Sequence, residues 1–80
     1  MNEKELQKSI IDIMSDTFNV KKEKISLSAS KSNLDEWDSL AHLKLFLALQ
    51  ESFRVNFSTD EIDSGNSLEK IYKLLKDKIR

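Results

Sequence analysis

The chain has 80 residues, of which 39% are hydrophobic and 34% are charged, and its formal net charge is -1. Residues 1–80 are expected to form a single small domain, which excludes a large self-contained catalytic cleft. A net charge this close to zero does not indicate a nucleic-acid binder, which is usually strongly basic. The absence of cysteine excludes disulfides, CxxC metal sites and a thiol nucleophile.

The N-terminal segment predicts a helix over residues 3–18, because its apolar residues recur at spacings of three and four. They are Leu6, Ile10, Ile13, Met14 and Phe18. Asn2 and Glu5 have the spacing of a capping box at its start. The segment is charged from its third residue and has no uninterrupted apolar run, so we expect a cytoplasmic protein without a membrane span.

Residues 19–37 form a polar connection that is long for a compact domain. Its isolated apolar residues, Val20, Ile25, Leu27 and Leu34, suggest a loop that is pinned onto a core. Trp37 at its end has two interpretations. It is either a hydrophobic staple beside the next helix or part of an exposed recognition surface.

A second helix is predicted over residues 38–53, with Asp38 as its N-cap and Ser39 at the first helical position. Its apolar residues cover more than one stripe, which predicts a central helix buried on more than one side. They are Leu40, Leu43, Leu45, Phe46, Leu47, Leu49 and Phe53. Leu43, Phe46 and Leu47 are interpreted as packed core rather than as the lining of a pocket that opens. Leu40 is either the first core-facing residue or a contact for a partner.

The C-terminal part predicts a short helix over residues 59–64, because Ser58 and Glu61 match a capping box. Gly65 and Asn66 then break the chain before an amphipathic last helix. Its apolar positions are Leu68, Ile71, Leu75 and Ile79. The fold class is therefore all-α: a small bundle of three main helices and one short helix, with a long loop between the first and second helices.

Ser39 is the candidate functional residue, and His42 is the only histidine available to activate it. A GxSxG elbow is missing, so hydrolysis is disfavoured, and a lone His42 is expected to be an exposed or half-buried helix residue rather than a ligand. A helix N-terminus with its free amide groups suits an attached phosphate instead. The competing interpretation is that Asp38 and Ser39 only start a helix.

The stretch "WDSLAHLKLFLALQESFRVNFSTDEI", residues 37–62, resembles the second helix and following segment of acyl carrier proteins. In that family an Asp-Ser-Leu motif precedes an apolar helix that ends in a Glu-x-Phe element. Here these are Asp38, Ser39 and Leu40, followed by Glu51 and Phe53. The first helix, the long loop and the last helix also have counterparts, so the resemblance spans essentially the whole chain.

The resemblance implies that Ser39 carries a covalent 4'-phosphopantetheine arm, whose thiol holds acyl, or aminoacyl, groups as thioesters. Asp38 and Leu40 would be flanking recognition residues. The implied partners are a phosphopantetheinyl transferase, an acyl- or aminoacyl-loading ligase and acyl-transferring or acyl-modifying enzymes. Such a carrier delivers its cargo without being an enzyme, and we expect a monomer that binds neither metal nor nucleic acid.

The chain departs from fatty-acid carriers in two ways. Glu36 and Trp37 replace the usual glycine and small residue, and residues 38–54 hold Asp38 and Glu51 against Lys44 and Arg54, so electrostatic steering is weaker. The sequence is more similar to stand-alone carriers of specialised pathways, such as surface polysaccharide, modified-sugar or secondary-metabolite assembly. General fatty-acid or lipid biosynthesis is the alternative pathway.

Two further classes stay open. One is a helical interaction module that keeps the carrier fold without the modification and binds a partner through the second helix. The other is a small DNA-binding domain, suggested by the basic last helix with Lys70, Lys73, Lys76, Lys78 and Arg80. For that helix a solvated face is the favoured interpretation.

Overall fold

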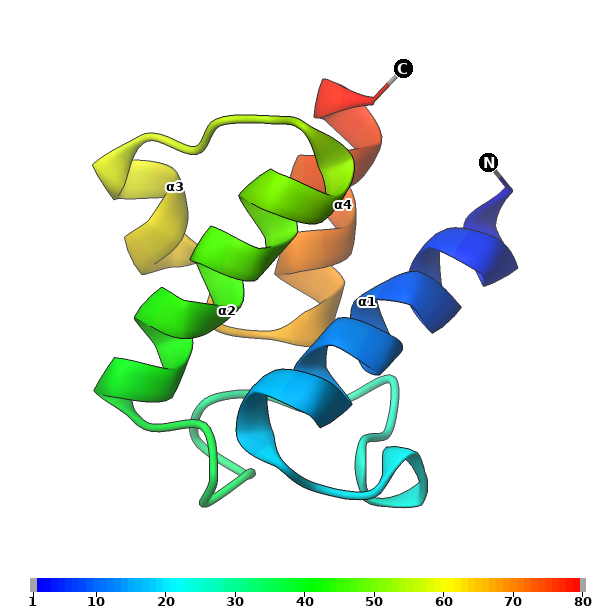
Figure 1. Ribbon diagram of the computed structural model, residues 1–80, viewed down its shortest axis with the longest axis vertical. Helices are drawn as coiled ribbons and strands as arrows, with labels where there is room; N and C mark the ends of the chain where they lie inside the picture. Colours follow the sequence, from blue (N-terminus) through cyan, green and yellow to red (C-terminus); the bar gives the residue numbers. More distant parts are fainter. Residues whose placement is uncertain (1, 80) are drawn as a thin grey trace.

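The computed structural model describes residues 2–79, and within them the chain folds into four α-helices (Figure 1). They are α1 (Glu3–Phe18), α2 (Ser39–Phe53), α3 (Thr59–Ser64) and α4 (Leu68–Lys78). The predicted all-α bundle of three main helices and one short helix is confirmed. Between residues 2 and 79 the only strand-like pairing is an isolated antiparallel bridge from Ser30 to Ser67.

Each helix begins where a polar side chain accepts a hydrogen bond from a free backbone amide. Asp38 Oδ1 accepts from the Ala41 N–H at 2.8 Å, which confirms the predicted start of α2. Ser58 and Glu61 form both hydrogen bonds of the predicted capping box at α3. At α1, Asn2 Oδ1 accepts from the Glu5 N–H at 2.8 Å, which is one half of the predicted box. These local bonds explain why helix starts are readable from sequence.

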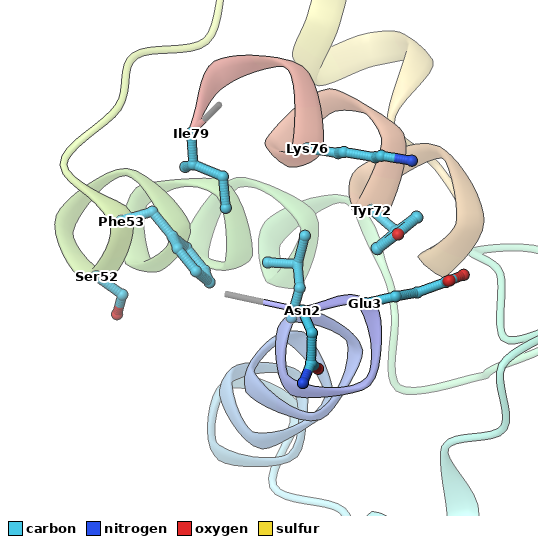
Figure 2. A pocket seen from close by; sticks show the side chains of 8 residues that line it. Asn2, Glu3, Ser52, Phe53, Tyr72, Lys76 and Ile79 are labelled. Carbon is cyan, nitrogen blue, oxygen red and sulfur yellow. The ribbon is translucent and has the colours of Figure 1, made fainter.

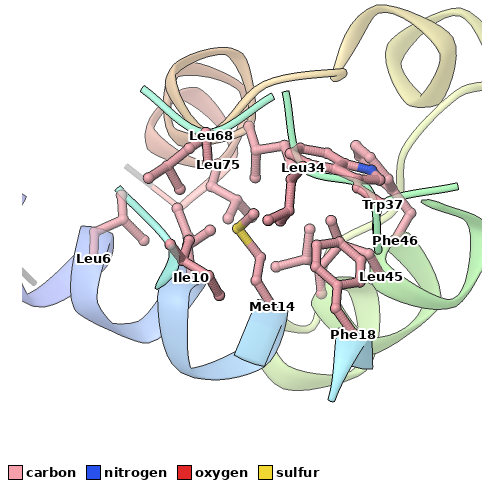
Figure 3. Packing of buried hydrophobic residues seen from close by; sticks show 14 of the residues in the cluster. Leu6, Ile10, Met14, Phe18, Leu34, Trp37, Leu45, Phe46, Leu68 and Leu75 are labelled. Carbon is pink, nitrogen blue, oxygen red and sulfur yellow. The ribbon is translucent and has the colours of Figure 1, made fainter. Parts of the chain in front are cut away.

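The core lies between α1, α4 and the inner face of α2, and the long loop closes its end (Figure 3). Met14 reaches from α1 into the middle of the cluster, and its side chain is fully buried. The other large side chains that are almost completely buried are Ile10, Trp37, Leu45, Phe46, Leu49, Leu68, Ile71 and Leu75. Each side chain of this size contributes about 1.5–3 kcal/mol on burial, so this cluster supplies most of the driving force for folding.

The long loop is pinned onto the core, as predicted. It contains one turn of 3₁₀-helix, η1 (Lys22–Lys24), and its Ile25, Leu34 and Trp37 side chains are buried, whereas Leu27 is exposed. Two backbone hydrogen bonds tie it to the start of α4: Lys31 N–H to Asn66 O and Leu68 N–H to Ala29 O, both 2.9 Å.

The prediction that α2 is buried on more than one side is wrong. Phe46 is buried as expected, but Leu43 and Leu47 are exposed and do not belong to the core. The domain is too small to cover both faces of α2. Its inner face is covered by α1, α4 and the loop, and nothing else between residues 2 and 79 covers its outer face.

Gly65 is required by a close approach rather than by an unusual backbone angle, and replacing it by alanine is predicted to destabilise the protein. A Cβ at this position would lie 2.5 Å from Phe46 Cζ and 3.3 Å from Leu74 Cδ1. Because Phe46 is packed in the core, we expect Gly65→Ala to lower the free energy of unfolding by about 1–3 kcal/mol in urea titrations. The control is the exposed neighbour Asp63→Ala, with a change within about 0.5 kcal/mol. Equal stability of Gly65→Ala and the wild type would contradict the close approach.

Candidate functional site

Ser39 is the first residue of α2, and its side chain is exposed to solvent. The neighbouring Asp38 carboxylate is turned away toward the helix, where it caps Ala41 N–H. The amine of Lys31 lies 3.5 Å from Ser39 Oγ, a distance at the outer limit of a hydrogen bond. The hydroxyl is therefore accessible and has a cation beside it.

Lys31 comes from the long loop, eight residues before Ser39 in the sequence. Its backbone is held by the bond from Lys31 N–H to Asn66 O, so the loop places its side chain next to the start of α2. A positive amine and the positive end of the helix dipole both favour an anion on Ser39 Oγ. The arrangement fits a phosphate ester at this hydroxyl. The negative charge of Asp38 opposes it, but that carboxylate accepts a hydrogen bond from Ala41 N–H.

The expectation that His42 is exposed or half-buried is wrong. Its side chain is 6% exposed, and both ring nitrogens have partners inside the protein. Nδ1 accepts from the Trp37 indole N–H at 3.0 Å, and Nε2 donates to the Ile62 carbonyl at 2.6 Å. With both nitrogens engaged inside the protein, the His42 ring is not available as a base for Ser39.

Trp37 is buried, so its interpretation as an exposed recognition residue is wrong. It lies one position before the N-cap and packs against His42, the fourth residue of α2, with ring centroids 6.0 Å apart. These are the two positions that a hydrophobic staple joins, although here one partner is an imidazole. The Trp37 ring also packs against Phe18 at the end of α1, with the two ring centroids 5.4 Å apart.

Leu40 is 62% exposed, so its interpretation as a core-facing residue is wrong as well. Together with Leu43 and Leu47, which are 55% and 65% exposed, it forms what we call the leucine stripe of α2. The stripe begins directly after Ser39, and the exposed Lys44 lies beside it. The spacing of three and four along the stripe can be read from the sequence. Leu45 and Leu49 have a similar spacing on the buried face, so spacing alone does not tell which face is exposed.

An open cavity of about 630 Å³ lies at the other end of α2, between the first turn of α1 and the end of α4 (Figure 2). Phe53 and Ile79 point into it, and Tyr72 and Lys76 line its other side. Since α2 rises 1.5 Å per residue, Phe53 lies about 21 Å along the helix from Ser39. The cavity is therefore separate from the candidate site.

Two of the four lysines of α4 are held in ion pairs, and a third donates to an amide oxygen. Lys73 pairs with Glu69 at 3.3 Å, Lys78 pairs with Glu61 at 3.1 Å, and Lys70 Nζ donates to Asn66 Oδ1. Arg80, which completed the predicted basic helix, lies outside the described residues. This pairing favours the solvated face over a contact with phosphates of DNA.

Residues 2–79 lack the features of two other classes of site. No helix there is both long and apolar enough to cross a membrane. In the same part of the chain, no group of three or more His, Cys, Asp or Glu side chains has the arrangement needed to hold a metal ion.

Comparison with models of known protein families finds no match to this sequence. Curated proteins give no match either. The functional assignment therefore depends on the residues and their geometry.

The cation beside Ser39 predicts a measurable coupling to a negative charge at this position. In a double-mutant cycle of Ser39→Glu with Lys31→Gln, we expect the introduced carboxylate to be more stabilising when Lys31 is present, by about 0.2–1 kcal/mol in chemical unfolding. The control cycle replaces Lys31→Gln by Lys44→Gln, which removes an exposed charge farther along α2. Equal coupling in both cycles would mean that Lys31 has no special relation to an anion on residue 39.

Proposed function

We propose that this chain is a stand-alone acyl carrier protein. Ser39 receives a 4'-phosphopantetheine arm from a phosphopantetheinyl transferase, and the protein delivers acyl, or aminoacyl, thioesters between enzymes in a specialised biosynthetic pathway. A loading ligase and acyl-transferring or acyl-modifying enzymes complete the set of partners. The protein itself catalyses none of these steps.

The observation that carries the proposal is the exposed hydroxyl of Ser39 at the first position of α2, in the Asp-Ser-Leu context. A transferase needs access to this oxygen, and the side chain is free on the solvent side. Asp38 is occupied as the helix cap, which keeps its carboxylate turned toward Ala41 N–H. Leu40 faces outward beside the hydroxyl, where an enzyme can contact it.

The residues at the site fit the proposed group. Ser39 Oγ would form the phosphodiester bond, and Lys31 Nζ, 3.5 Å away, would partly neutralise its negative charge. When bound, the arm supplies a thiol, the group on which thioesters form. The chain contains no cysteine, so no protein thiol competes for the acyl group.

The leucine stripe supports α2 as the surface that partner enzymes bind. Three leucines that are each more than half exposed form an apolar patch next to the attachment point, and such patches mark interaction sites. Within α2 the exposed charges near the stripe are Lys44 and, one turn past Leu47, Glu51. Recognition would depend on apolar contact more than on electrostatic steering, which favours dedicated partners over those of general fatty-acid synthesis.

The same stripe favours a second candidate, an unmodified helical module that binds a partner protein through α2. An apolar patch serves binding whether or not Ser39 carries an arm. The two candidates differ in one property, which is whether Ser39 is modified.

The proposed attachment predicts a gain in mass. On incubation with coenzyme A, Mg²⁺ and a broad-specificity phosphopantetheinyl transferase, the intact mass should increase by one phosphopantetheine. Ser39→Ala should gain nothing, because the attacking oxygen is missing. Ser52→Ala is the matched control: it removes another exposed hydroxyl of α2, near the opposite end of the helix, and should be modified like the wild type.

An increase in mass in Ser39→Ala would place the attachment elsewhere. No increase in the wild type, with a transferase that modifies a known carrier in parallel, would favour the unmodified binding module.

The leucine stripe predicts a recognition defect without loss of stability. Leu40→Gln should raise the transferase KM about 3- to 10-fold, since it removes apolar contact area next to Ser39. Its unfolding free energy should change by less than about 0.5 kcal/mol, because the side chain is exposed. Leu27→Gln is the control, as Leu27 is 58% exposed but belongs to the loop. An equal KM for both variants would contradict the role of Leu40.

A further inference from the structure

His42 connects the segment just before the candidate site to the short helix α3. It is the one polar or charged side chain in the buried set between residues 2 and 79. Buried polar groups need hydrogen-bond partners, and His42 has one on each side: the Trp37 indole before α2 and the Ile62 carbonyl of α3. The His42 side chain thus joins the residues just before α2 to the short helix α3.

The bond to Ile62 satisfies a carbonyl at the end of a short helix. The last carbonyls of a helix have no partner within it, and in α3 the Glu61 carbonyl is taken by Gly65 N–H at 2.9 Å. The next carbonyl, that of Ile62, receives the His42 Nε2–H at 2.6 Å. His42 therefore caps α3 from a neighbouring helix.

Polar contacts hold much of α3 in place, because none of its six residues is fully buried and Ile62 is the one that packs, partly buried, against the core. Besides the bond from His42, Glu61 pairs with Lys78 of α4 at 3.1 Å. The Ser58 backbone N–H and the Lys78 amine hold the pKa of Glu61 below its usual value. A helix with little buried apolar surface has low local stability, so each of these contacts matters for its placement.

On the other side, the bond to Trp37 fixes the turn that presents Ser39. Trp37 is 1% exposed and lies two residues before Ser39. Its indole N–H, buried beside Phe18, has His42 Nδ1 as its acceptor at 3.0 Å. Loss of that acceptor would leave a buried donor unpaired and favour a different ring position.

We infer that His42 is a positioning residue: as the neutral Nε2–H tautomer it holds the Trp37–Ser39 turn and α3 in one arrangement, and so places Ser39 for modification. The effect of His42 on the modification of Ser39 rests on the proposed function. Its role in holding the turn and α3 is independent of that function. Two hydrogen bonds from one ring, to segments on either side of it, carry the inference.

The first measurement needs no variant. Imidazole ¹⁵N shifts of the wild type should give the pattern of the Nε2–H tautomer, with Nδ1 unprotonated. The single tryptophan makes the indole N–H a unique reporter, and its hydrogen exchange should be slow. A protonated Nδ1 in the folded protein near pH 7 would overturn the inference, because two N–H groups would then face each other.

The second measurement compares His42→Phe with His42→Gln and with the core control Ile10→Val. Phenylalanine keeps the ring but loses both hydrogen bonds, whereas glutamine keeps one donor and one acceptor. In His42→Phe we expect indole exchange and α3 amide exchange at least about 10-fold faster than in Ile10→Val. The Ile10→Val change removes one buried methyl group about 12 Å along α1 from Phe18, the residue of α1 that contacts Trp37. Glutamine should restore part of the protection.

The third measurement separates positioning from general destabilisation. In transferase assays, His42→Phe should lower kcat about 5-fold with little change in KM, because the leucine stripe remains while Ser39 is displaced. Ile10→Val should leave both constants unchanged, and His42→Gln should recover part of kcat.

Each of these measurements tests a different part of the inference. Indole and α3 exchange in His42→Phe no faster than in Ile10→Val would overturn the positioning role. Faster exchange with an unchanged kcat would overturn its link to Ser39. If the wild type is not modified at all, the proposed carrier function fails, and the tautomer and exchange data still test whether His42 fixes this arrangement.

Discussion

Burial of the Trp37 indole beside Phe18 and His42 is the contact on which the rest of this structure depends. It joins the end of α1 to the start of α2 and closes a loop of residues 19–37 that has only one turn of regular structure. The row continues through Phe46 to Phe57, with centroid distances of 5.0 and 4.9 Å. Aromatic pairs contribute about 0.5–1.5 kcal/mol each beyond their buried area. The row therefore gives a small core both stability and a defined loop.

The same packing divides α2 into two faces with different roles. Leu45, Phe46 and Leu49 complete the core, while the leucine stripe stays in water. Leucines that stay more than half exposed add little to folding, because they bury less than half of their surface in the free protein. An apolar surface that is adjacent to Ser39 and contributes little to stability supports the proposed docking of α2 on partner enzymes.

Ser39 owes its setting to three different segments. α2 provides the helix start, the loop provides Lys31, and the bridge from Trp37 through His42 ties the turn to α3. A hydroxyl placed in this way is exposed yet supported by buried neighbours. The combination suits a covalent attachment point, where the oxygen must be reachable and its surroundings must stay in place.

Helix bounds and fold class could be predicted from the sequence, because caps such as Asp38, Ser58 and Glu61 act over three or four residues and apolar spacing repeats with the helix turn. The sequence also singled out Ser39. Long-range packing was needed to show that the leucine stripe faces water, that His42 is buried and that Lys31 lies beside Ser39. Periodicity describes both faces of α2 equally well, and the buried face is chosen by elements that are distant in the chain and pack against only one of them.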